Sequence, residues 1–105
     1  MTSAPVANPV QFAGLDYEFP SVLWILKHEQ LGKFGCYCFQ GINGLAAFST
    51  EALAIDFAKW VAELLLATQE VTFDEAREVA KGRPLPVIAL FLCDDLDAVQ
   101  IHYVK

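Results

Sequence analysis

The sequence predicts an α+β domain of two layers, in which an antiparallel or mixed sheet of about four or five strands carries two helices on one face. Three observations lead to this class. Strand-like segments form one group before two helix-like segments and a second group after them. An Asn43-Gly44 pair between apolar runs is typical of a β-hairpin. Finally, 55% of the 105 residues are hydrophobic and only 19% are charged, which excludes a disordered chain.

The expected order is three strands, two helices and two strands, in one domain over residues 21–105. Residues 1–20 precede this domain as an extended arm, because they contain three prolines and few helix signals. The apolar side chains of the arm need a packing surface, either on their own chain or on a neighbouring one. Residues 22–27 are apolar on both strand parities, and their β-branched and aromatic content favours a buried strand over a short helix.

The Asn43-Gly44 pair sets the predicted register of the hairpin over residues 36–49. Asn-Gly supplies the two positive-φ residues of a type I′ turn, which joins antiparallel strands. A two-residue loop at this point pairs Ile42 with Leu45. Three aromatic side chains then share one face of the hairpin: Tyr37, Phe39 and Phe48.

A long helix is predicted from Glu51 to about Thr68, with Ser49 or Thr50 as its N-cap. Five side chains follow the spacing of a core face: Leu53, Phe57, Trp60, Val61 and Leu64. Three more apolar side chains lie outside that stripe: Ile55, Leu65 and Leu66. The helix is therefore too apolar to have one fully solvated side.

The second helix and the last two strands have clear boundaries. Thr72 and Glu75 have the spacing of a capping box, and Gly82 marks the end of the helix that they begin. Residues 87–93 are typical of a buried strand. The alternation over residues 99–104 predicts a half-exposed strand at or near an edge of the sheet.

Composition and charge exclude several classes of protein. The longest near-apolar run, Leu85 to Cys93, is far too short to span a membrane. The net charge is −6 and the basic residues are scattered, so we expect neither nucleic acid nor an anionic membrane as a partner. The first residues have no signal-peptide pattern, and the cysteine count is odd, so we expect reduced thiols and a cytoplasmic location.

Two groups of residues could hold a metal ion. Cys36 and Cys38 project from the same side of a strand, but a zinc site needs about four ligands, and the chain has few others to offer. Asp94, Asp95 and Asp97 follow a buried strand, where carboxylates can bind Mg²⁺ or act in acid–base catalysis. For both groups we favour the structural interpretation, packed cysteines and a solvated turn, and we predict no cofactor and no catalytic residue.

Isolated histidines and tryptophans offer a second hypothesis, a small-molecule- or metal-binding protein or an enzyme. Its pocket would lie between sheet and helices near Asp94 and Asp95. The candidate pocket residues are Trp24, Trp60, His28 and His102. A third hypothesis, a thiol-based redox module, depends on the reactivity of the two nearby cysteines.

The leading hypothesis is a non-catalytic interaction module that self-associates as a homodimer. The chain holds about ten more apolar residues than an average domain of its length, and a small domain cannot bury them all. Exposed apolar patches mark interaction sites, and twofold dimers are the commonest closed assemblies. The predicted interface residues lie on the arm and the long helix: Phe12, Leu15, Tyr17, Phe19, Ile55, Leu65 and Leu66.

Overall fold

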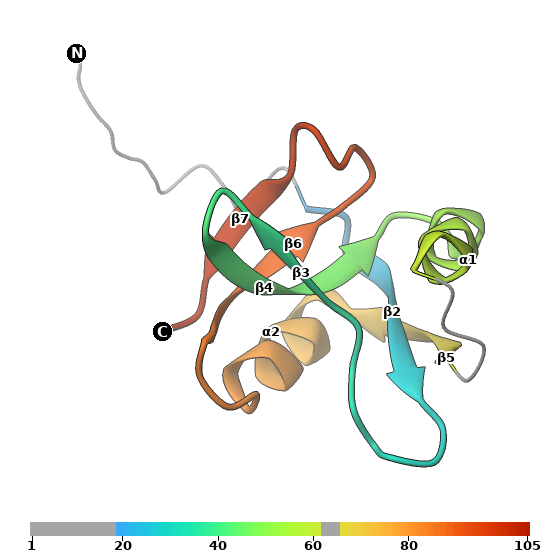
Figure 1. The fold of residues 1–105 in the computed structure, drawn as a ribbon, viewed down its shortest axis with the longest axis horizontal. Helices are drawn as coiled ribbons and strands as arrows, with labels where there is room; N and C mark the ends of the chain where they lie inside the picture. Colours follow the sequence, from blue (N-terminus) through green and yellow to red (C-terminus); the bar gives the residue numbers. More distant parts are fainter. Residues whose placement is uncertain (1–18, 62–65) are drawn as a thin grey trace.

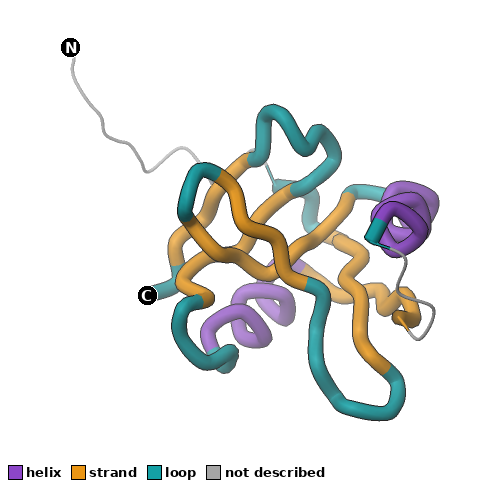
Figure 2. The backbone as a smooth tube through the Cα atoms, in the orientation of Figure 1, coloured by secondary structure: helices purple, strands orange, loops and turns teal. Residues whose placement is uncertain are grey.

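The computed structural model describes residues 19–61 and 66–105, and within them it shows a six-stranded mixed sheet with two packed helices (Figure 1). The predicted α+β class is therefore confirmed. The elements are β2 (Val22–His28), β3 (Cys36–Phe39), β4 (Ile42–Phe48), α1 (Glu51–Trp60), β5 (Leu66–Thr72), α2 (Phe73–Lys81), β6 (Val87–Leu92) and β7 (Gln100–Tyr103). Figure 2 shows how the strands gather between the two helices.

Strand β4 is the centre of the sheet, whose order is β5-β2-β4-β6-β7. On one side β4 pairs with β6 in parallel. On the other side it pairs with two antiparallel strands in succession, first β3 and then the middle of β2, where Trp24 lies opposite Phe48. The two parallel strands therefore end at the same edge of the sheet, beside the start of α1.

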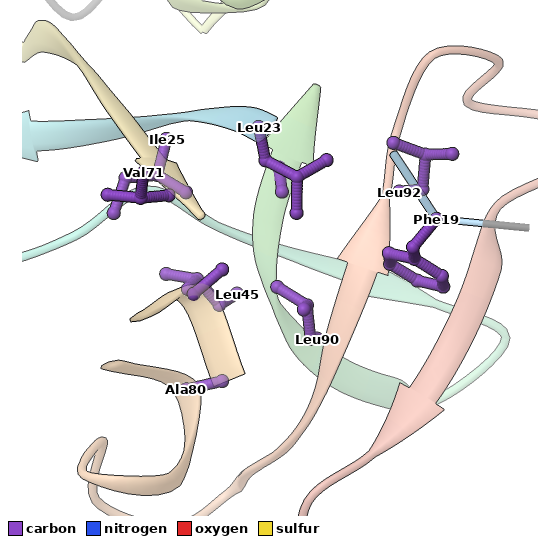
Figure 3. Close-up of a cluster of buried hydrophobic side chains, with 10 residues drawn as sticks. Phe19, Leu23, Ile25, Leu45, Val71, Ala80, Leu90 and Leu92 are labelled. Atoms are coloured by element: carbon purple, nitrogen blue, oxygen red, sulfur yellow. The ribbon is translucent and has the colours of Figure 1, made fainter. Parts of the chain in front are cut away.

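The two helices cover opposite faces of the sheet, so the expectation of both helices on one face is wrong. Ala80 of α2 lies in the same buried cluster as Leu90 (Figure 3). Phe57 of α1 lies in a second cluster with Phe91. Because Leu90 and Phe91 are consecutive in β6, their side chains point to opposite faces. The strands that are apolar on both parities require this cover on both sides.

The hairpin turn lies three residues earlier than Asn43-Gly44, so the predicted register is wrong. The turn residues are Gln40 and Gly41, which both have positive φ, at 51° and 82°. Phe39 therefore pairs with Ile42. The shared face of Tyr37, Phe39 and Phe48 is confirmed, since all three belong to the cluster on the α1 side.

The predicted helix over residues 51–68 is too long. Helix α1 ends at Trp60, and residues 66–72 form β5, which pairs with β2 along its full length. A strand therefore stands between the two helices, an element that the sequence analysis missed. Backbone pairing with the outer edge of β2 decides the conformation of these residues, because their apolar pattern alone fits either state.

The end of β5 leads directly into α2, as the capping box predicted. The Thr72 hydroxyl accepts from the Glu75 backbone N–H at 3.1 Å, and the Glu75 carboxylate accepts from the Thr72 N–H at 2.8 Å. Gly82 is the C-cap of this helix, also as predicted. The predicted strands at β2, β6 and β7 are confirmed as well, and β7 forms one edge of the sheet.

Phe19, at the end of the predicted arm, packs on its own chain. Its side chain is buried, and its ring lies 5.4 Å from the ring of Phe73 in α2. It is thus part of the core rather than a free interface residue. Three other predicted interface residues of the arm, and one of the helix, lie outside the described residues: Phe12, Leu15, Tyr17 and Leu65. Within the described part of the chain, neither helix has the length and apolarity needed to cross a membrane.

Candidate functional site

A groove beside α1 brings together two of the predicted site residues, Trp60 and Asp94. It has a volume of about 230 Å³ and lies where the parallel strands β4 and β6 end. The edge at which parallel strands end is a common place for binding sites, because the chain leaves the sheet there in loops and helix starts. We call this the Trp60 groove. Its lining includes Phe48, Leu53, Asp56, Phe57, Trp60 and Asp94.

Trp60 is held in place although 64% of its side chain is exposed. Its ring lies 5.6 Å from that of Phe57 and 6.3 Å from that of Tyr37. Phe57 in turn contacts the ring of Phe48, at 5.3 Å. The tilted and edge-to-face geometry of these pairs is the favourable one for aromatic rings. The exposed indole is therefore fixed by neighbouring rings and presents a rigid apolar surface.

Two carboxylates line the Trp60 groove. One oxygen of Asp94 accepts from the backbone N–H of Ser49 at 2.9 Å, which ties the β6–β7 loop to the start of α1. Asp56 projects from α1, one turn before Trp60. Neither carboxylate forms an ion pair within residues 19–61 and 66–105. Acidic groups beside an exposed indole attract cations, both by charge and through the face of the ring.

Cys93 closes the floor of the groove but cannot act as a nucleophile. Burial raises the pKa of the Cys93 thiol to about 12; a hydrogen bond with the Ala47 backbone opposes this shift and the nearby Asp94 carboxylate adds to it. The thiol is therefore neutral at physiological pH, and the thiolate is the reactive form. Cys93 acts here as a small apolar residue of the core.

Asp95 and Asp97 form a turn beyond the groove. An oxygen of the Asp95 side chain accepts from the Asp97 N–H at 2.9 Å, and the Asp95 carbonyl accepts from the Ala98 N–H at 3.1 Å. This geometry favours the turn interpretation of the acidic run. In the described part of the chain, no three His, Cys, Asp or Glu side chains approach closely enough to hold a metal ion.

His28 and Cys36 lie in a second and larger cavity, of about 400 Å³, which we call the Phe34 cavity. The Cys36 thiol donates to the Phe34 carbonyl at 3.6 Å. Burial raises the pKa of this thiol, and the positive charge of Arg83 partly offsets the shift. Cys38 lies two residues further along β3, at an exposed position, and lines neither cavity.

The remaining predicted site residues differ in exposure, and none of them lines the Trp60 groove. Trp24 is half-buried against the α1-side cluster. His102 packs edge-on against the rings of Phe73, at 5.3 Å, and Phe19, at 6.1 Å. Both contacts of His102 lie on the α2 side of the sheet, so His102 and Trp60 do not share a site. Leu66 is half-buried in β5, whereas Ile55 is 40% exposed on α1.

Asp56 and Lys33 are cavity residues that the sequence analysis did not select. Asp56 precedes Trp60 by four residues, which places both on neighbouring turns of one helix, so helical spacing could have identified it. Lys33 lies in the β2–β3 loop and lines the Phe34 cavity. No periodic pattern marks a loop residue, and only the fold brings it to the cavity.

Comparison with known protein families, curated proteins and solved structures finds no match to this chain.

Proposed function

We propose that this protein is a non-catalytic interaction module that self-associates as a homodimer through the exposed side of α1. The exposure of Trp60, which is 64% exposed while its ring packs beside Phe57 and Tyr37, carries this proposal. Tryptophan is the residue type most enriched among side chains that dominate binding energy at interfaces. Ile55 and Val61 add further exposed apolar surface on the same helix and at its end, at 40% and 41%.

The exposed side of α1 is also complementary to itself in charge. Asp56 and Lys59 are three residues apart and lie on one side of the helix with Trp60. In the described residues neither side chain has an ion-pair partner. In an antiparallel pairing of two α1 helices, a twofold axis near Phe57 brings Lys59 of one copy level with Asp56 of the other. Lys59 can then enter the acidic Trp60 groove of the second copy, where the indole face also favours a cation.

The oligomeric state tests this proposal directly. Light scattering coupled to gel filtration at micromolar concentration should give the mass of two chains. Trp60→Glu places a charge in the contact and should give the mass of one chain. Leu85→Glu is the matched control, because Leu85 is 74% exposed but lies before β6, away from α1, and this variant should stay dimeric.

A charge exchange tests the pairing itself. Asp56→Lys alone or Lys59→Asp alone brings like charges together and should weaken the dimer. The double variant restores opposite charges and should recover the dimer. A monomeric wild-type protein, or a double variant as weak as the single ones, would overturn the proposed pairing.

A binding site for a metabolite or metal near Asp94 and Asp95 is the alternative function, and it has less support. Both side chains accept hydrogen bonds from backbone N–H groups, which already accounts for them. The Trp60 groove is also smaller than the cavities of roughly 300–1,000 Å³ that usually hold a small molecule. Because all three cysteines are free, we also infer a reducing compartment, the cytoplasm, as the place of action.

A further inference from the structure

The Phe34 cavity combines apolar walls with a cationic rim. At about 400 Å³ it lies within the usual size range of small-molecule sites. Apolar side chains form most of its wall: Leu31, Phe34, Phe57, Val61 and Leu66. Its polar lining comes from His28, Lys33 and the Cys36 thiol. The side chains of His28 and Lys33 cannot carry a negative charge. The Cys36 thiol is negative only as a thiolate, which burial disfavours by raising the pKa of this thiol.

Basic side chains gather around Phe34 although the protein as a whole is acidic. The Arg83 guanidinium lies 4.8 Å from the centre of the Phe34 ring, and the Lys27 ammonium lies 5.7 Å from it. The Lys105 ammonium donates to the Arg83 carbonyl oxygen. With Lys33, three of the seven Lys and Arg residues of a chain with net charge −6 therefore lie close to this ring or line the cavity beside it.

Among the described residues, these cations form no ion pair with an acidic side chain. The sole ion pair among residues 19–61 and 66–105 joins Arg77 to Asp74 in α2. The Nε atom of Arg83 is buried and makes no hydrogen bond with a described residue. A buried donor without an acceptor is energetically unfavourable. Because this atom is enclosed, an anion beside Phe34 would offset the charge of the guanidinium without reaching Nε.

The loop that forms the cavity wall is held by its own hydrogen bonds. The His28 backbone N–H donates to the Lys33 carbonyl, and the Gly32 N–H donates to the His28 carbonyl at 3.0 Å. The His28 Nδ1 atom accepts from the Leu31 N–H at 3.2 Å. The proton of the neutral imidazole is therefore on Nε2, which leaves His28 as a hydrogen-bond donor. The cavity thus offers donors and a cation on a preformed loop. Figure 1 shows the course of this loop between β2 and β3.

We propose that the Phe34 cavity binds an amphiphilic organic anion, a small molecule with an apolar body and a carboxylate or similar group at one end. The apolar body lies against Leu31, Phe57 and Leu66. The anionic group lies at the Phe34 end, where Lys33 lines the cavity and the charges of Lys27 and Arg83 lie beside the Phe34 ring. This site adjoins the proposed contact between copies on α1, because Phe57 and Val61 border the cavity as well.

Octanoate is a suitable probe, because it combines a flexible apolar chain with one carboxylate. Titration of octanoate into the ¹⁵N-labelled protein should shift the amide signals of residues 28–36 and raise the melting temperature. Octylammonium, which has the same chain and the opposite charge, should bind far more weakly. Acetate, which has the same charge and almost no apolar body, should not bind. Equal effects of octanoate and octylammonium, or of octanoate and acetate, would refute the proposal.

Two variants test the cationic rim, and one serves as a control. Lys33→Gln changes an exposed loop residue, so the fold is retained, and the octanoate dissociation constant should rise about tenfold, as expected for one lost charge-assisted hydrogen bond. Arg83→Gln should weaken binding in the same direction. Lys81→Gln removes an exposed cation at the end of α2, which does not line the cavity, and should leave octanoate binding unchanged. Unchanged binding in Lys33→Gln would contradict the assignment.

A membrane lipid could offer the same chemistry as a free acid. Sedimentation with phosphatidylglycerol vesicles separates the two sources. The protein should remain in the supernatant, because the cavity accommodates one short chain and the net charge of −6 is repelled by an anionic surface. Pelleting with these vesicles would overturn the assignment to a free organic acid.

Discussion

The ring of Phe91 occupies the space into which a side chain at Gly44 would project. A Cβ atom at Gly44 would lie 2.6 Å from a ring carbon of Phe91, well inside contact distance. Phe91 is fully buried in the centre of the sheet, so its ring has no room to move. Gly44 is therefore a packing residue of a central strand, although Asn-Gly is otherwise the typical sequence of a hairpin turn.

We expect Gly44→Ala to lower the free energy of unfolding by about 1–3 kcal/mol, the usual cost of overpacking a core. Gly82→Ala is the matched control. Gly82 is the C-cap of α2 with negative φ, and the nearest atom to its Cβ would lie 3.4 Å away. Chemical denaturation measures both changes. Equal stability of the two variants would show that the ring of Phe91 moves aside.

At the scale of the elements, the junction of β5 and α2 is the sharpest boundary in the chain. Thr72 is the last residue of β5 and the N-cap of α2, and the reciprocal bonds with Glu75 satisfy two N–H groups. Thr50, the N-cap of α1, accepts one bond, from the Leu53 N–H at 3.2 Å. The capping box at Thr72 thus fixes both the start of α2 and the change in chain direction from strand to helix.

Thr72→Ala should therefore destabilise the protein by about 1 kcal/mol or more, and Thr50→Ala by less. The reason is that Thr72→Ala leaves the Glu75 N–H without its acceptor at a point where a paired strand enters a helix. Urea denaturation of the two variants under identical conditions gives the comparison. A larger loss in Thr50→Ala would mean that α1, and not the β5–α2 junction, limits stability.

Some elements could be predicted from sequence patterns alone, and others could not. The capping box, the strand after Pro86 and the final edge strand were each predicted, because patterns of residues close in sequence mark them. β5 was not, because residues 66–68 continue the apolar pattern of α1. Its strand state depends on pairing with β2, some forty residues earlier in the chain. The cationic surroundings of Phe34 have the same origin, since Lys27 and Arg83 are far apart in sequence.

At the scale of the whole molecule, the protonation of Cys93 links stability to alkaline pH. Burial raises the pKa of this thiol from its ordinary value of 9.0 to about 12. Below pH 9 the thiol is neutral in both the folded and the unfolded chain, and its contribution to stability is fully present. Between pH 9 and 12 only the unfolded chain loses the proton, so stability falls as the pH rises.

We expect the free energy of unfolding to fall by up to about 1.4 kcal/mol per pH unit in this interval from Cys93 alone. Cys93→Ala should give a flatter dependence on pH, whatever its absolute stability. Cys38→Ala, at an exposed position, serves as the control and should retain the wild-type slope. Denaturation curves between pH 8 and 12 provide the slopes, and identical slopes for all three proteins would contradict this role of Cys93.

In the folded molecule, the Trp60 groove and the Phe34 cavity share one lining side chain. Phe57 is buried and lines both the Trp60 groove and the Phe34 cavity. Its ring therefore separates the proposed contact between copies from the proposed anion site. Any ligand that moves this ring acts on both, and such coupling is reciprocal: occupation of one surface changes the affinity of the other by the same factor.

By itself, the sequence determined the α+β class and the elements with local boundary signals, whereas Trp60 and Val61 of its predicted core face are exposed. These properties depend on hydrophobic periodicity and on caps, which involve residues a few positions apart. The tertiary structure decided the hairpin register, the strand after α1, the placement of the helices on opposite faces and the convergence of cations at Phe34. Each of these features depends on which distant segments become neighbours. The alternative conformations of a short segment are close in free energy, and contacts with a packed partner segment decide between them.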